Sequence, residues 1–342
     1  MTQEWLGRLN GDPMPWLLDD DADNPGVQYF ALKELLDRPL DDAEVVEARK
    51  TVMSTGPVPI ILDAQDPEGY WVQPGPGYNP KYRSTVWSVS MLAQLSADGS
   101  DPRVQKGCQY ILDHAIDKNG AFSASGTQGG AILCLMGNLS AALLELGLLG
   151  DERLRGAIEW MARAVTGEGI SPAEQKDAPV HYLKSATCAP DFCCSANDSK
   201  PCAWGAVKVM LAFSKLPEDA RTPLIQKAIA TGLEFLLSKD PAMADYPMGY
   251  STKPSQSWFR FGFPQFYVTD VLQNLEVLTS FGYGADPRLS AAMNLVAGKQ
   301  DQQGRWKMEY TYNGKTWAHI EEKGKPSKWV TLRALRVLKH AR

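Results

Sequence analysis

The chain has 342 residues, of which 44% are hydrophobic and 22% charged, and its net charge is −5. This is the composition of a soluble globular protein. No basic stripe interleaved with aromatic residues is present, which argues against nucleic acid as a partner.

The N-terminal helical segment, residues 1–55, opens with an early acidic residue, Glu4, and has no apolar run of signal-peptide length. We therefore expect a cytoplasmic protein, in which disulfides are uncommon. The six cysteines are then expected to be thiols, metal ligands or catalytic groups. Residues 24–39 follow as the first predicted helix.

Five later stretches share one pattern: a small polar residue, any residue, a large side chain, and a small or β-branched residue that opens an apolar helix. They recur at intervals of about 50 to 70 residues, a period typical of repeat architectures. The pattern predicts five inner helices, at 85–95, 131–148, 202–214, 266–281 and 327–339. Because equivalent repeat positions come together, we expect the opening residues at one end of the molecule: Thr85, Cys134, Cys202, Gln265 and Ser327.

More amphipathic helices lie between these stretches. Asp101, Asp151 and Asp286 each begin one, since aspartate is a favoured N-cap. Two further outer helices are predicted at 42–53 and 223–237. No segment alternates as a half-buried strand does, so we expect an all-α protein. The apolar stretch 131–150 has the length of a membrane span, but Asn138, Ser140 and Glu145 favour a buried helix.

Two connections carry the same element, Gln-x-x-x-Gly-x-Trp. One copy runs from Gln65 to Trp71 and the other from Gln300 to Trp306. The glutamine can bond the end of a helix, the glycine allows a tight turn, and the tryptophan fills a gap between helices. Each copy follows a predicted outer helix, which supports the repeat.

This element resembles the QW motif of the squalene-hopene and oxidosqualene cyclases. The alternating helices resemble the toroid shared by those cyclases, by the β-subunits of protein prenyltransferases, and by small isoprenoid enzymes such as linalool dehydratase-isomerase. The resemblance covers residues 57–338. It implies a single domain over residues 1–342, an (α/α)5–6 toroid, with an apolar central cavity for an isoprenoid chain.

A long irregular stretch, residues 167–201, carries most of the candidate ligands: His181, Cys188, Asp191, Cys193 and Cys194. So many soft ligands in one loop are consistent with zinc or with reactive thiols. The alternative is a lid filled by small buried thiols. We expect this loop to cap the cavity, and the metal candidates are His181, Asp191, Cys193 and Cys202.

Cys202 opens an inner helix, where the helix dipole favours a thiolate. In the prenyltransferases an Asp-x-Cys supplies two zinc ligands at this position, but here Lys200 stands in place of the aspartate. The histidine that opens the last inner helix in that family is also replaced, by Lys328. Cys134 holds the equivalent position one repeat earlier and is a second candidate, either as a reactive group or as a core thiol. Cys193 is the third cysteine that we regard as a catalytic candidate.

Asp270 is the candidate acid, because a carboxylate that faces an apolar cavity has a raised pKa. The alternative is a structural hydrogen bond to a neighbouring inner helix. Aromatic rings at repeat positions can stabilise a cation or can simply pack the repeats. These candidate substrate-binding residues are Tyr82, Trp87, Trp204, Tyr267 and Trp329.

Two family motifs bear on the reaction. The Asp-x-Asp-Asp acid motif of the cyclases is absent, which argues against squalene-type cyclisation. Residues 19–23 match the Asp-Asp-x-x-Asp of class I terpene synthases, but they precede a helix start at Asn24 and are better interpreted as a solvated acidic turn.

Three functions are compatible with these observations. The first is an enzyme, a lyase or isomerase, that dehydrates, isomerises or cyclises an isoprenoid or similarly apolar small molecule. The second is a zinc-dependent prenyl-type transferase. The third is a toroid that binds a lipid or a peptide without chemistry. The partners expected are an apolar small molecule and, peripherally, a membrane surface.

Overall fold

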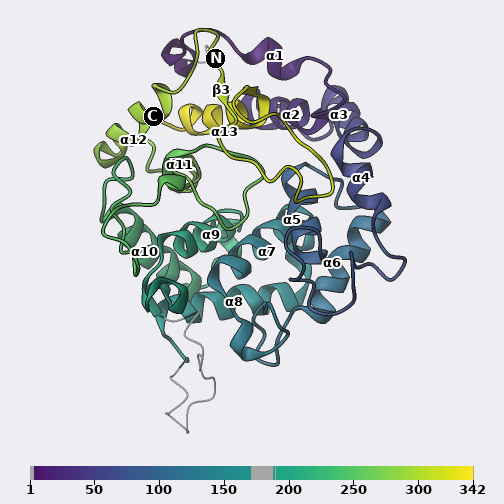
Figure 1. Ribbon diagram of the computed structural model, residues 1–342, viewed down its shortest axis with the longest axis vertical. Helices are drawn as coiled ribbons and strands as arrows, with labels where there is room; N and C mark the ends of the chain where they lie inside the picture. The colour runs from purple at the N-terminus through teal and green to yellow at the C-terminus, as the bar shows by residue number, and fades with distance from the viewer. Residues whose placement is uncertain (1–3, 171–187, 189, 342) are drawn as a thin grey trace.

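The computed structural model describes residues 4–170, 188 and 190–341, and over these residues the chain is mainly helical. The inner helices follow one another around the molecule, as the colour gradient in Figure 1 shows. From the second inner helix on, each contacts the next in chain order, and the last contacts the first. These inner segments are α2 (Pro25–Phe30) continued by η2 (Ala31–Leu35), α5 (Thr85–Gln94), α7 (Leu133–Glu145), α9 (Ala203–Ser214), α11 (Val271–Ser280) and α13 (Lys328–Lys339).

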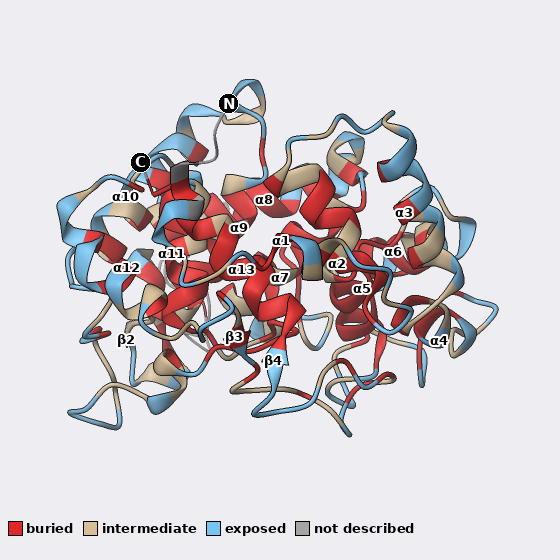
Figure 2. Cartoon of the chain, turned by 90° about the horizontal axis from the view of Figure 1, so that it is seen from above, coloured by how far each residue is buried: buried red, intermediate tan, exposed pale blue. Residues whose placement is uncertain are grey.

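A second set of helices packs outside the first. Each helix of this second set contacts an inner helix that lies close to it in the sequence. The inner helices are buried over most of their length, whereas the outer helices expose one face (Figure 2). The outer and connecting helices are α1 (Met14–Leu18), α3 (Ala43–Ser54), α4 (Pro57–Asp63), α6 (Pro102–His114), α8 (Glu152–Thr166), α10 (Pro223–Leu237) and α12 (Ser290–Ala297).

Short 3-10 segments and two small hairpins complete the described elements. The hairpins pair β1 (Cys193–Cys194) with β2 (Lys200–Pro201), and β3 (Trp306–Lys307) with β4 (Pro326–Ser327). The 3-10 segments are η1 (Glu4–Arg8), η3 (Gln128–Gly130), η4 (Leu148–Gly150), η5 (Pro190–Phe192), η6 (Ser195–Asn197), η7 (Glu218–Ala220), η8 (Gln256–Phe259) and η9 (Pro287–Leu289). Among the described residues no helix has the length and apolar character of a transmembrane span.

The aspartates predicted to start outer helices do so. Asp101, Asp151 and Asp286 each accept a hydrogen bond from the backbone N–H two residues later, that of an arginine in every case. The same arginine folds back onto the carboxylate, so the cap is also an ion pair. In Asp286 these bonds from Arg288 lower the pKa to about 2.

The two Gln-x-x-x-Gly-x-Trp elements have the same hydrogen bonds. The indole N–H of Trp71 donates to the Ile61 carbonyl, and that of Trp306 donates to the carbonyl of Val296, both at 2.7 Å. The backbone N–H of Trp71 donates to the hydroxyl of Thr85 in α5. The backbone N–H of Trp306 donates in the same way to Thr331 in α13. Each tryptophan therefore ties an outer helix to the following inner helix.

This equivalence corrects the predicted alignment of the last repeat. Thr331, not Ser327, corresponds to Thr85, so the sequence pattern is misplaced by one helical turn in α13. The fourth predicted inner helix also begins later than expected, at Val271 rather than 266. The carboxylate of Asp270 accepts from the backbone N–H of Gln273 and caps the helix there, while Gln265 lies in the preceding connection.

Glycine sets the closest approach between two inner helices. A Cβ at Gly137 in α7 would lie 2.3 Å from the backbone carbonyl carbon of Lys208 in α9, so no other residue fits without a shift of one helix. This contact holds the backbone of Lys208 against α7 near the centre of the molecule.

Candidate functional site

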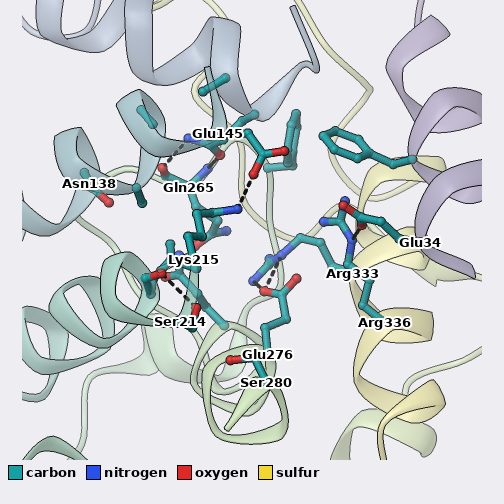
Figure 3. A pocket seen from close by; sticks show the side chains of 18 of the residues that line it. Glu34, Asn138, Glu145, Ser214, Lys215, Gln265, Glu276, Ser280, Arg333 and Arg336 are labelled. Carbon is teal, nitrogen blue, oxygen red and sulfur yellow. Dashed lines mark hydrogen bonds and ion pairs between the residues drawn. The ribbon is translucent and has the colours of Figure 1, made fainter. Parts of the chain in front are cut away.

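A cavity of about 510 Å³ lies between the inner helices, at the end where those helices terminate. All six inner segments contribute to its wall, and Figure 3 shows their polar side chains directed toward one another. The lining residues are Phe30, Glu34, Asp37, Ser90, Ala93, Gln94, Asn138, Ala141, Ala142, Glu145, Leu211, Ser214, Lys215, Phe263, Gln265, Gln273, Glu276, Thr279, Ser280, Arg333, Arg336 and His340.

Arg333 is the most deeply buried charged residue of this wall and holds two carboxylates. Its Nη1 and Nη2 donate to the two oxygens of Asp270 at 3.0 and 2.9 Å, a bidentate ion pair. Nε and Nη2 donate to Oε2 of Glu276 at 3.1 and 2.8 Å. Burial by itself lowers the pKa of Arg333, but the two carboxylates raise it, so the guanidinium stays charged.

The other charges at the cavity are paired in the same way. Glu145 binds Lys215 and lies 3.6 Å from Nζ of Lys33. Burial opposes ionisation of Glu145, but these lysines lower its pKa to about 2. Arg336 binds Glu34, the carboxylate on the opposite side of the cavity in Figure 3. Each cation of this wall therefore has an acidic partner, and the cavity has little net charge.

Besides these charges and several hydroxyl and amide side chains, the wall has an apolar part. Two rings line this part, Phe30 of α2 and Phe263 of the connection before α11. Small and aliphatic side chains of α5, α7 and α9 line it with them: Ala93, Ala141, Ala142 and Leu211. The family resemblance implied an apolar central cavity, whereas this one joins apolar side chains to a set of ion pairs. It therefore suits a molecule with both an apolar and a polar part.

The cavity lies at the opposite end of the inner helices from the expected mouth. Thr85, Cys134, Cys202 and Ser327 do lie at the starts of their helices. None of these four lines the cavity. Gln265 does line it, because its connection runs inward and its backbone exchanges two hydrogen bonds with the side chain of Gln94 near the end of α5.

The expected mouth is filled by rings that we call the aromatic plug: Tyr82, Trp87, Phe266, Tyr267 and Tyr312. Phe266 stacks on Tyr82 with centroids 5.3 Å apart, and Trp87 meets Tyr267 edge to face at 5.2 Å. Asn138 anchors the plug from α7 by a hydrogen bond to the carbonyl of Phe266. Tyr82, Trp87 and Tyr267 thus pack against one another rather than line the cavity.

The remaining two aromatic candidates also lie outside the cavity wall. Trp329 is buried and stacks on Phe263, with centroids 4.2 Å apart and nearly parallel rings. Because Phe263 lines the cavity, Trp329 supports its wall from behind. Trp204 is half-buried at the start of α9.

The cysteines do converge, as predicted for Cys134 and Cys202. Cys202 hydrogen bonds to Cys134 and to Cys194, and Cys188 lies close to Cys194. The bond with Cys134, together with burial, raises the pKa of Cys202 to about 12, and the bond with Cys202 raises that of Cys194. The predicted thiolate at this helix start is therefore wrong, because neighbouring thiols and burial outweigh the helix dipole.

The metal candidates of the sequence are His181, Asp191, Cys193 and Cys202. His181 lies outside the described residues. Asp191 is exposed, and burial together with the charge of Asp191 raises the pKa of Cys193. Within the described ranges no three His, Cys, Asp or Glu side chains are placed to hold a metal ion. Asp191, Cys193 and Cys202 thus do not form a ligand group. The described part of the loop packs on outer helices, with Phe192 stacked on Phe235 of α10.

Asp270, the candidate acid, is buried in the ion pair with Arg333 and also caps α11. Both of its oxygens accept hydrogen bonds from Arg333 of the neighbouring inner helix α13. This is the structural role that we gave as the alternative to an acid. Sequence reasoning missed Lys208, which is fully buried in the middle of α9. A signal for it was available, because it is the single charged residue within the apolar inner stretch 202–214.

No family model matches this sequence. No curated protein matches it either. Solved structures with a similar course of the chain include a ligand-free variant of the type II terpene cyclase MstE from Scytonema, with 14% identity, coverage of 83% of this chain and 94% of the other, and a TM-score of 0.34. A second MstE variant, in complex with geranylgeranyl dihydroxybenzoate, has 15% identity, 83% and 95% coverage, and a TM-score of 0.33. A protein from Actinoplanes has 13% identity, 83% and 97% coverage, and a TM-score of 0.34.

Proposed function

We propose that the protein is a single α/α toroid and an enzyme that acts on a small isoprenoid carrying an uncharged polar group, bound in the central cavity. The observation that carries this proposal is the composition of the cavity wall. One side is apolar, and the other holds carboxylates and cations that are already paired, such as Arg333 with Glu276 and Lys215 with Glu145.

The pairing argues for an alcohol or a phenol rather than a diphosphate. A diphosphate needs an excess of positive charge, whereas here each cation of the wall has an acidic neighbour. A hydroxyl group can instead exchange hydrogen bonds with Ser214, Gln94 or Asn138. This preference also separates the proposal from a prenyl transferase, whose donor carries a diphosphate.

Dehydration or isomerisation needs a group that takes up and returns a proton. His340 lies at the cavity rim, with Nδ1 2.8 Å from the carbonyl oxygen of Arg336. If Nδ1 carries the proton and donates to this carbonyl, the unprotonated Nε2 is left to act as the base. Positive charge that develops on the substrate is stabilised by the fixed carboxylates of Glu145 and Glu276. The proposal gives Asp270 the task of orienting Arg333, and it assigns no reacting role to Cys134, Cys193 or Cys202.

The test combines binding with turnover. The purified protein is titrated in a calorimeter with geraniol and, separately, with geranyl diphosphate. We expect binding of the alcohol and weaker binding of the diphosphate. Analysis of the geraniol incubation by gas chromatography is expected to show a dehydrated or rearranged product. Preferential binding of the diphosphate would contradict the proposal, and binding without a product would favour a non-catalytic toroid.

A pair of matched variants locates the site. Ala142→Phe places a ring in the cavity wall and is expected to abolish geraniol binding. Ala291→Phe makes the same change on the exposed side of α12 and is expected to leave binding unchanged. Equal binding by both variants would show that the alcohol binds elsewhere.

A further inference from the structure

Lys208 lies directly beneath the cavity. On α9 the residues that line the cavity include Leu211 and Lys215, which are three and seven positions after Lys208 and therefore on the same helix face. The amine of Lys208 donates to Oε1 of Gln273, and Gln273 itself lines the cavity from α11. The side chain of Gln273 is thus the group that lies between the amine of Lys208 and the cavity.

This amine has no carboxylate partner. Among the described residues no salt bridge includes Lys208, in contrast to Lys215 and Lys33, which both pair with Glu145. The charged and titratable groups that face it are Cys134 from α7, Asp270 and Glu276 from α11, and Arg333 from α13. Burial outweighs the attraction of the two acids, which are engaged by Arg333, and lowers the pKa of Lys208 to about 7.

We propose that Lys208 is a covalent binding site for an aldehyde or ketone that enters the central cavity. The lone pair of the amine attacks the carbonyl carbon and forms a carbinolamine. Loss of the carbonyl oxygen as water, with the two hydrogens of the amine nitrogen, leaves a carbon–nitrogen double bond. No oxidant or reductant is needed, and the imine formed on the buried Lys208 is an uncharged group.

The site is expected to be selective because a larger fraction of this amine is deprotonated than of an ordinary lysine. An ordinary lysine with a pKa of about 10.4 is deprotonated in only about 0.1% of molecules near pH 7.5, whereas an amine with a pKa near 7 is mostly deprotonated. Lys215, which lines the cavity, is engaged in an ion pair with Glu145. The inference rests on the proposed use of this cavity for a small isoprenoid, and it adds carbonyl compounds to the molecules that the cavity is proposed to bind.

The experiment uses citral, an unsaturated isoprenoid aldehyde, as the probe, with sodium borohydride to reduce any imine to a stable secondary amine. Intact-mass analysis is expected to show one added citral group, and peptide mapping is expected to place it on Lys208. The yield is expected to rise as pH increases through about 7. Exposed lysines are expected to react about 600-fold more slowly at pH 7.5, in proportion to their smaller deprotonated fraction.

Two variants keep the test decisive. Lys208→Met retains the length of the side chain without a buried charge, so it is expected to fold and to lose the adduct. Lys215→Met removes the competing lysine and is expected to keep the adduct. An adduct on Lys215 or spread over surface lysines would overturn the inference, as would no adduct at all in folded protein.

Geraniol separates this inference from the proposed function, because an alcohol cannot form an imine. Lys208→Met is expected to bind geraniol as the parent protein does. Geraniol binding without a citral adduct would refute the covalent site alone. A citral adduct on Lys208 without geraniol binding would refute the proposed alcohol substrate alone.

Discussion

The two ends of the inner helices differ in what occupies the space between them. Where the helices begin, the aromatic plug and the thiols of Cys134, Cys194 and Cys202 fill it. Where the helices end, ion pairs such as Arg333 with Asp270 surround an open cavity. Rings and thiols can fill the space at the first end because they need few hydrogen-bond partners. At the second end the charged side chains pair with one another, and an open space remains between the pairs. The difference indicates that the first end is a packed core and that the second end has room for a ligand.

The largest effect is expected at the open end. Arg333→Met leaves Asp270 and Glu276 buried without their cation, which typically costs about 3–5 kcal/mol of the free energy of unfolding. Urea denaturation checks this value, and Arg155→Met, at an exposed pair with Glu152, serves as the control. A cost below about 1 kcal/mol would mean that the ion pairs do not hold this end together.

The plug is expected to respond nearly as strongly, but through packing. Phe266→Ala removes a fully buried ring that contacts Tyr82, Trp87 and Tyr312, at a cost of about 3 kcal/mol. Thermal and urea unfolding measure the loss, with exposed Tyr250→Ala as the aromatic control. If the variant is as stable as the control, the rings at this end are not a packed core.

Lys208 is expected to make stability depend on pH. Its folded pKa of about 7 lies below the value of about 10.4 for an unfolded lysine, so between these values the unfolded chain binds more protons. The free energy of unfolding therefore rises with pH in this window, by about 1 kcal/mol per unit, and the penalty is fully present below pH 7. Urea denaturation at pH 7 and pH 9 measures the slope.

The lysine variants attribute that slope to one residue. Lys208→Met is expected to remove this part of the slope and to be the more stable protein at pH 7. Lys239→Met changes an exposed lysine and is expected to keep the parent slope. A parent slope that persists in Lys208→Met would show that another group titrates.

The smallest effect is expected at the thiols. Cys202→Ser replaces a protonated, mostly buried thiol far along the helices from the cavity, so a stability loss of about 1 kcal/mol and unchanged geraniol affinity are expected. Calorimetry with the variant and the parent compares the affinities. A clear loss of ligand binding or turnover in a stable Cys202→Ser protein would place the site at the thiols instead.

The helices and their caps were predictable because they depend on local signals. Asp101, Asp151 and Asp286 cap helices through bonds to residues two positions away, and both Gln-x-x-x-Gly-x-Trp elements form the same local turn. The helical character of the chain follows from such spacings. The register of α13 was not predictable in this way, since only the bond from Trp306 identifies Thr331 as its equivalent position.

The position of the open space could not be deduced from repeat spacing. Equivalent residues gather at one end of the helices, but whether that end is open depends on what enters it. Here the connection with Phe263, Gln265 and Phe266 turns inward, held by Gln94 and Asn138 from two other repeats. Contacts across so many residues leave no local pattern, so the site candidates fell at the closed end. Lys208, in contrast, was visible as a charge within an apolar helix.

The bonds between the two ends of the described chain have a consequence for how the protein folds. The backbone N–H of Asn10 bonds to Gln300, and Asn24 accepts from the indole of Trp329, across separations of 290 and 305 residues. Closing loops of this length costs entropy before any contact compensates it, which slows folding. During synthesis α2 emerges long before its neighbour α13 (Figure 1). The helix α2 therefore reaches its final packing only after the chain as far as α13 has been made.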